Sequence, residues 1–291
     1  MDFLDEDALE EPDVLEKYKL IILTEPDVPS AGMAGLLAWA ESGGTLVAVS
    51  NAGSGDAYNT PSSALSDAAK VMEPPRKRLV FNGDDTIAAG TSGTVGQTSF
   101  KTPAGTFGGL TPTATSAGTP VKTLGTYADG TPAVTSTPVG SGSIVRFGWL
   151  PGVAYWFSHT ETVPPTPIGW DNSNTGNRPR SEGIRRIIAD LARTADVIAP
   201  VVASATHVET PLLVTPDKKK AIVTLLNFSP GLPVPRVPSL QLEVRLPFIP
   251  TTVESVEHGA LTFTTATSGT QQHIVNFTVP ALTYGDFVAM K

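Results

Sequence analysis

The hydrophobic pattern of this chain changes once, near Pro200, and this change limits the folds that the chain can adopt. Before that point, short apolar runs of strand length alternate with patterns of helical period. After it, eight short apolar or alternating segments follow one another with no helical period. We therefore expect an α/β domain over residues 1–197 and an antiparallel β-sandwich over residues 198–291. A chain of 291 residues is long enough for two cores.

A strand–helix–strand unit is predicted near the N-terminus. Residues 18–24 and 45–50 are short β-branched apolar runs, which is typical of buried parallel strands. Between them, Ser30 is expected to cap a helix that ends near Ser42, where two glycines follow. Open sheets bind ligands beyond the carboxyl ends of their strands, so the turn at residues 51–55 is a candidate site. The apolar stripe of the helix consists of Met33, Leu36, Leu37 and Ala40.

The rest of the first domain is predicted to add strands and one more helix. Residues 121–128 and 131–138 flank an Asp-Gly dipeptide and indicate a hairpin. Residues 143–149 read as a core strand, and residues 181–195 as an amphipathic helix. Residues 83–120 are rich in Gly, Thr, Ser and Pro, which suggests long loops or an inserted β-meander.

The second domain is expected to consist of short antiparallel strands separated by turns. Eight segments have strand length and an alternating or continuous apolar pattern. They are residues 201–207, 211–215, 221–228, 240–246, 253–258, 260–265, 273–279 and 286–290.

Composition excludes several classes of partner and chemistry. The net charge is −8, and residues 1–16 alone hold eight acids and no base, so the remainder is formally neutral. Nucleic acid is therefore not expected as a partner, since it requires a basic face. The absence of cysteine excludes thiolate catalysis and disulfides, and the four histidines show no metal-ligand spacing, so we expect neither metal nor cofactor. No apolar run approaches 18 residues and no signal peptide is evident, so no membrane partner is expected and the compartment stays open.

Four phrases carry a family resemblance, and their order along the chain is more specific than any one of them. Tyr18–Leu23, Leu37–Val47, Tyr127–Ala133 and Gly140–Gly148 resemble the trimerisation domain of family 42 β-galactosidases. That domain is amidotransferase-like, so the resemblance implies a flavodoxin-like parallel sheet, followed by a glycosidase-type β domain. It also implies that the chain lacks the first strand–helix unit and the upstream catalytic barrel, as the C-terminal part of a longer protein would.

The resemblance also shows which catalytic residues are missing. Class I glutamine amidotransferases end the last core strand of this fold in His-Pro-Glu, which activates a cysteine. The matching positions here are Leu150, Pro151 and Gly152, and the chain has no cysteine. We therefore expect that amidotransferase activity is lost and that the chain is a non-catalytic, homo-oligomeric assembly region of a glycoside-hydrolase-like protein.

A serine hydrolase of the esterase type is the alternative. Ser54 lies in the turn where the amidotransferase nucleophile would be, and His159 and Glu161 form a His-x-Glu beyond the core strand. A relay needs a base within reach of the hydroxyl and a carboxylate that holds the base. The amides of the two glycines beside Ser54 could form an oxyanion hole. Asp56 and the Asp84-Asp85 pair are alternative acid–base groups, although acids in such turns are usually solvated.

Ligand-binding residues are predicted around the same strand ends, with a carbohydrate or a small ester as the ligand. Aromatic rings just beyond the core strand could stack on a sugar, or could form a hydrophobic plug between the two domains. The predicted ligand-binding set is Asn51, Gly53, Trp149, Tyr155, Trp156 and Trp170.

Overall fold

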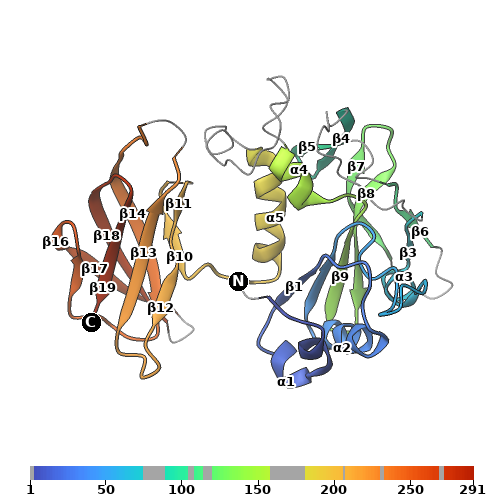
Figure 1. The fold of residues 1–291 in the computed structure, drawn as a ribbon, viewed down its shortest axis with the longest axis horizontal. Coiled ribbons are helices and arrows are strands. Elements are labelled where there is room, and N and C mark those ends of the chain that lie inside the picture. The colour runs from blue at the N-terminus through green and yellow to red at the C-terminus, as the bar shows by residue number, and fades with distance from the viewer. Residues whose placement is uncertain are drawn as a thin grey trace. The chain divides into compact units, whose positions relative to one another are not determined.

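A computed structural model of the chain describes residues 3–74, 89–103, 108–113, 120–157, 181–205, 207–229, 233–268 and 272–291. These residues form two units, of which the first ends at Val197 and the second begins at Ile198. The first unit mixes helices and strands, whereas the second contains strands only (Figure 1). No helix among the described residues is long and apolar enough to cross a lipid bilayer.

The elements of the first unit are named as in Figure 1. In chain order they are the 3₁₀ helix η1 (Asp7–Glu10), α1 (Pro12–Leu15), β1 (Leu20–Leu23), α2 (Ser30–Glu41), β2 (Thr45–Ala48), α3 (Ala64–Ala69), β3 (Val71–Met72), β4 (Ala89–Val95), β5 (Thr98–Pro103), β6 (Thr111–Pro112), β7 (Lys122–Tyr127), β8 (Pro132–Val139), β9 (Gly142–Phe147), α4 (Pro151–Phe157) and α5 (Glu182–Thr194).

A seven-stranded sheet in the order β1-β2-β9-β8-β7-β4-β5 forms the centre of this unit. Only β1, β2 and β9 are parallel, and every other neighbouring pair is antiparallel. The prediction of a parallel sheet is therefore wrong for the half beyond β9. The reason is that short turns connect β7 to β8 and β8 to β9, and a tight turn can join only antiparallel strands. The predicted meander is present in part, as β4 and β5 extend the same sheet.

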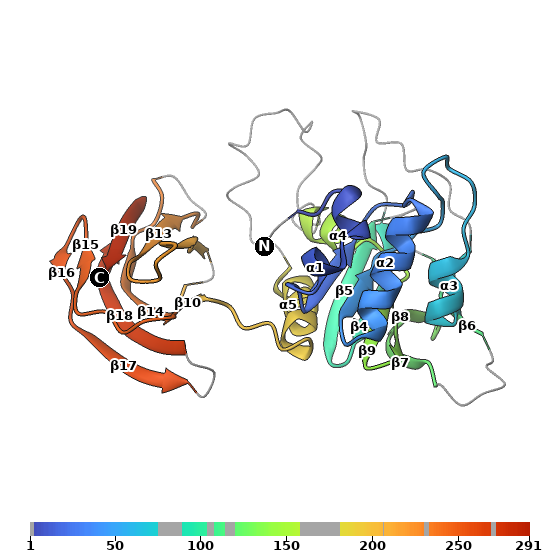
Figure 2. The same cartoon turned by 90° about the horizontal axis from the view of Figure 1, so that it is seen from below.

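Helices cover both faces of the parallel strands, which explains why these strands are mainly apolar. Leu46 and Ile144 belong to the core on the α2 side, which also contains Leu36. The next residues along, Val47 and Val145, belong to the core on the other side, which α5 supplies with Ile184 and Ile187. Figure 2 shows α2 lying along the sheet.

Glycines end α2 as predicted, although Ser30 does not cap its start. Pro29 occupies the N-cap position and Ser30 is the first helical residue, without a side-chain capping bond. At the other end, the amide of Gly44 donates to the Trp39 carbonyl at 3.2 Å and that of Gly43 to Ala40 at 3.2 Å. These two bonds form a Schellman motif, and Gly43 has the positive φ of 131° that the motif favours.

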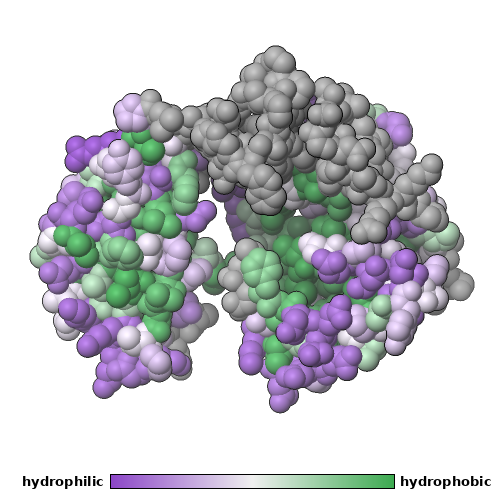
Figure 3. Space-filling view, in the orientation of Figure 1, coloured by the Kyte–Doolittle hydropathy of each residue, from purple (hydrophilic) through white to green (hydrophobic). Residues whose placement is uncertain are grey.

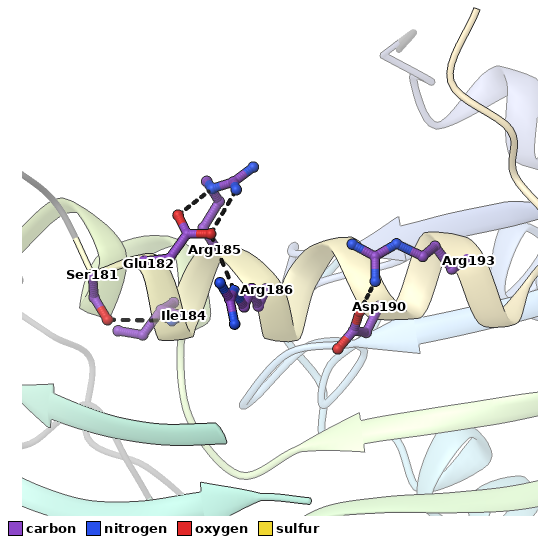
Figure 4. A network of polar contacts seen from close by, with 7 residues as sticks. All are labelled: Ser181, Glu182, Ile184, Arg185, Arg186, Asp190 and Arg193. Atoms are coloured by element: carbon purple, nitrogen blue, oxygen red, sulfur yellow. Dashed lines mark hydrogen bonds and ion pairs between the residues drawn. The ribbon is translucent and has the colours of Figure 1, made fainter. Parts of the chain in front are cut away.

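Helix α5 has a side-chain cap at its N-terminus and ion pairs along its surface (Figure 4). Its cap is Ser181, whose hydroxyl accepts from the Ile184 amide at 3.2 Å. In its first turn, Glu182 accepts two bonds of 2.7 Å from Arg185 and one of 3.2 Å from Arg186. These bonds, chiefly those from Arg185, lower the pKa of Glu182 to about 2. The acid also lies at the positive end of the helix dipole.

The second unit consists of two antiparallel sheets that share one core. Their orders are β10-β14-β18-β17 and β11-β13-β19-β15-β16, with β12 also pairing with β13. The eight predicted segments each contain strand residues. The strands are β10 (Val201–Ala203), β11 (Val208–Glu209), β12 (Leu212–Val214), β13 (Ala221–Asn227), β14 (Val237–Leu246), β15 (Val253–Ser255), β16 (Gly259–Ala260), β17 (Phe263–Ser268), β18 (Gln272–Leu282) and β19 (Gly285–Met290).

A buried carboxylate holds the hairpin of β15 and β16 against β19. Asp286 accepts from the hydroxyl of Ser255 at 2.5 Å and from the amide of Glu257 at 3.2 Å. The imidazole of His258 in the same turn contacts the Ala281 carbonyl at 2.7 Å. The acid, the serine and this histidine therefore have structural partners and do not form a relay.

Replacing Gly44 by Ala is expected to destabilise the first unit by about 1–3 kcal/mol, the usual cost of overpacking. A Cβ at this position would lie 2.4 Å from Cε2 of the Trp39 ring. The measurement is urea unfolding followed by tryptophan fluorescence, since all four tryptophans precede Ile198. Gly152→Ala is the matched control, because no atom lies within 4 Å of the Cβ it would add. Equal midpoints for both variants would contradict the packing argument.

Replacing Glu182 by Gln is expected to have a small and pH-dependent effect. The pKa of Glu182 falls from 4.5 to about 2 on folding. The stabilisation that its ionised carboxylate gives to the folded state is therefore complete above pH 4.5. It is lost as the pH decreases from 4.5 to 2. Because solvent screens this exposed pair, the variant should lose less than about 1 kcal/mol at neutral pH. Unfolding of both proteins across this pH range checks the prediction, which fails if the difference grows in acid.

Candidate functional site

The carboxyl ends of β1, β2 and β9 meet at one edge of the sheet, where the sequence predicts a site. The segments that follow these strands bond to one another. The Val49 amide donates to the Leu23 carbonyl at 3.2 Å, and the Ser50 amide donates to the Trp149 carbonyl at 3.3 Å. The turn that follows β2 is thus held between the ends of its two neighbours.

A buried ion pair lies under this turn. Arg146 in β9 and Glu73, just after β3, are joined by a bond of 2.9 Å between Nη2 and Oε2. Their side chains are only 3% and 6% exposed. Burial of two charges costs several kcal/mol each, and the pair offsets this cost only if further polar groups surround it.

The ion pair has such groups in the turn after β2. The hydroxyl of Ser50 donates to Oε1 of Glu73, and the amide of Asn51 donates to Oε2 at 3.0 Å. The guanidinium of Arg146 also donates to the Ala52 carbonyl at 3.3 Å. Burial lowers the pKa of Arg146, and Glu73 opposes this effect. The cluster therefore fixes residues 50–52 to β9.

The proposed oxyanion hole is not available. The amide of Gly53 donates to the Glu25 carbonyl at 2.9 Å, and that of Gly55 donates to the Pro26 carbonyl at 3.0 Å. Gly53 has φ of 64°, and a Cβ there would lie 2.6 Å from Cε of Met33, so this position favours glycine. Both amides therefore bond the loop after β2 to the loop after β1.

The predicted relay is not assembled by the described residues. Ser54 is exposed, whereas Ser50 is buried and bonded to Glu73. His159 and Glu161 lie outside the described residues. The three histidines that the structure describes are all in the second unit.

Trp149, the central residue of the predicted aromatic ligand site, lies in the hydrophobic core. Trp149 is fully buried, with its ring stacked on Phe100 at a centroid distance of 4.3 Å and meeting Phe147 edge-on at 5.5 Å. It has no exposed face for a sugar. Tyr155 is half-buried in α4. The side chain of Trp156 and the whole of Trp170 lie outside what the structure describes.

The positions that match His-Pro-Glu serve as the start of a helix. Leu150 packs partly against the core on the α2 side, and its carbonyl accepts from the Ala154 amide at 2.9 Å. Pro151 is the first residue of α4, where a missing amide proton has no cost. Gly152 has no side chain. These three residues therefore supply no acid or base.

The remaining acidic candidates are Asp56 and the Asp84-Asp85 pair. One oxygen of Asp56 accepts from the amides of Tyr58 and Thr60, each at 2.9 Å, and these bonds lower its pKa. Asp56 thus stabilises a turn. Asp84 and Asp85 lie outside the described residues. No group of His, Asp and Glu that could hold a metal ion occurs within the described part of the chain.

Sequence reasoning missed Glu73 and Arg146, although one signal was present. Arg146 interrupts the apolar run of β9, and a charged residue in a buried strand requires a partner. The partner is 73 positions away, so the pattern around Arg146 does not identify it.

Comparisons with known proteins show the fold. No family model and no curated protein matches the chain. Gan42B, a family 42 β-galactosidase from G. stearothermophilus, aligns over 97% of this chain with a TM-score of 0.60 and 16% identity. A β-galactosidase from Bacillus circulans sp. alkalophilus aligns over 97% with a TM-score of 0.59 and 14% identity. An α-L-fucosidase from Paenibacillus thiaminolyticus aligns over 94% of this chain with a TM-score of 0.54 and 13% identity. At such identities, these likenesses concern the fold alone.

The chain spans only part of these structures. It covers 33% of Gan42B, 34% of the Bacillus circulans enzyme and 41% of the fucosidase.

Replacing Glu73 by Gln should cost about 3–5 kcal/mol of unfolding free energy, because it leaves the buried Arg146 without its counter-charge. Replacing Arg146 by Met in addition should recover part of this loss, since the two effects are coupled. Urea unfolding followed by tryptophan fluorescence gives both values. The ion pair has no structural role if Glu73→Gln unfolds at the wild-type midpoint, or if the two losses simply add.

Proposed function

We propose that this chain is a non-catalytic assembly region of a glycoside-hydrolase-like protein, with an amidotransferase-like first unit that has lost its chemistry. The fold likeness to two β-galactosidases supports the first part of this proposal. The sequence resemblance to their trimerisation domain supports the second. The share of those larger proteins that the chain covers also fits, because an assembly region is a part of a whole enzyme and the chain corresponds to about a third of their length.

The closed strand-end edge argues against catalysis there. A hydrolase needs a nucleophile, a base and unpaired donors facing an open site. Here several polar groups of this edge bond to one another: Glu73 to Arg146 and Ser50, and the amides of Gly53 and Gly55 to backbone carbonyls. Nε of Arg146 and Nε1 of Trp149 are buried without a hydrogen-bond partner among the described residues. The same bonds make the edge rigid, which suits a scaffold.

The observation that carries the assembly role is the edge strand β1. It pairs with β2 alone among the described strands, so the other side of its Leu20–Leu23 backbone has no strand partner. Ile22 in this strand is 44% exposed. An apolar edge without charge or proline is suited to pair with another chain. In this proposal, a second copy of the chain covers this edge.

Another apolar surface serves as a comparison. On the outer face of the sheet that contains β13 and β19, large apolar side chains are exposed, and part of it is visible in Figure 3. Leu213 and Ile222 are paired across β12 and β13, and Ile222 is also 44% exposed. Its equal exposure makes Ile222 a matched control for Ile22.

Light scattering coupled to size exclusion should show an oligomer at micromolar concentration. Ile22→Lys should shift it towards monomer, because it places a charge on the apolar edge, whereas Ile222→Lys should not. A strict monomer for the wild type would overturn the assembly role. Dissociation by Ile222→Lys alone would move the interface to the second unit and contradict the role of β1.

A further inference from the structure

The outer face of the four-stranded sheet in the second unit carries a groove of about 830 Å³. This volume lies within the range of roughly 300–1,000 Å³ for small-molecule sites. All four strands of the sheet, β10, β14, β18 and β17, contribute residues to it. The groove lies wholly within the second unit.

The register of the strands places polar side chains side by side in this groove. Asn276 in β18 is opposite Glu243 in β14 and opposite Thr264 in β17. Two residues further along β18, Thr278 is opposite Gln241. Since side chains on alternate positions share a face, these five form two adjacent polar rows.

The polar groups in these rows are free to bind a ligand. Gln241, Thr264, Asn276 and Thr278 are exposed, and their side chains make no hydrogen bond to the described residues. Amides provide both donors and acceptors, and hydroxyls do so with a rotatable proton. The inner residues of the same strands, such as Leu242 and Val275, are buried in the sandwich core. The rows are therefore carried by a rigid sheet.

The charge of the groove selects among ligand classes. Among the described residues that line it, Glu243 alone is ionic, and it is paired with Arg245 at 2.6 Å, so this lining has no net positive charge for a phosphate or a polyanion. Exposed apolar surface is also present, from Val202 on one side and from Pro280. Neutral amides and hydroxyls beside small apolar patches match the alternating hydroxyl and CH surfaces of a sugar.

We propose that this groove binds a neutral carbohydrate, a short stretch of an oligosaccharide that lies across β14, β18 and β17. Binding is weak, with a Kd on the order of 1 mM, because Phe263 at the groove is half-buried against the core and leaves little ring surface for stacking. Hydrogen bonds from Asn276 and Gln241 determine the affinity. The site is independent of the assembly role proposed above.

Affinity electrophoresis of the full chain in native gels tests this proposal. The probes are soluble β-galactan, arabinoxylan and mixed-linkage β-glucan, with polygalacturonate as the anionic comparison. At least one neutral polysaccharide should retard the wild-type protein. Asn276→Ala and Gln241→Ala should each weaken this retardation by about 2- to 10-fold, the range for one neutral hydrogen bond. Thr278→Val, which keeps the shape of the side chain, should have a similar effect.

Glu254→Ala is the matched control, since Glu254 is exposed in β15, on the other sheet. It should leave retardation unchanged. Circular dichroism shows whether each variant is folded, and Thr278→Val provides the result if an alanine variant is not. The proposal is overturned if no neutral polysaccharide retards the protein, if polygalacturonate alone does, or if Glu254→Ala weakens binding as much as Asn276→Ala. An oligomer would strengthen retardation by avidity, but the effect of each substitution is read against the wild type in the same gel, and the oligomeric state is measured separately, so the two proposals succeed or fail separately.

Discussion

The buried ion pair of Glu73 and Arg146 is the constraint on which the strand-end edge of the first unit depends. Two charges in a low-dielectric core are stable only with each other and with surrounding dipoles. Here the dipoles come from Ser50, Asn51 and Ala52. Together with the backbone bonds of the turn after β2, this interaction fixes where that turn lies, and it joins the turn to β9 and to the segment after β3.

This arrangement explains why the strand ends of this sheet leave few backbone donors for a ligand. Strand ends in open sheets present turns whose backbone and side chains often bind substrates. In this protein the same groups are used internally. The amides of Gly53 and Gly55 bond to carbonyls of the preceding loop, and the aromatic residue after β9, Trp149, is packed into the core. Stability and binding compete for the same donors, and in this protein the amides of Gly53 and Gly55 serve stability.

In the second unit, the buried acid is hydrogen-bonded within the protein, whereas polar residues on one outer face are not. Its one described buried acid, Asp286, is satisfied by Ser255 and by backbone amides. On the outer face of the four-stranded sheet, by contrast, the side chains of Gln241 and Asn276 have no hydrogen-bond partner among the described residues. A sheet whose inner face is a continuous apolar core can carry such residues at little cost, because water satisfies them when no ligand is present. This face is thus the best-supported ligand surface within the described part of the chain.

Local patterns were sufficient to predict β1, α2, β2, α5 and the positions of the later strands, because residue periodicity and glycine stops act over one or two turns. The order of an α/β part followed by a β part was predicted for the same reason. Only the tertiary structure decided that β8, β7, β4 and β5 join the sheet antiparallel, that Arg146 meets Glu73 across 73 positions, and that Trp149 lies in the core. Strand order, buried ion pairs and the solvent exposure of one ring depend on which distant segments approach, and the sequence pattern around a single residue does not contain that information.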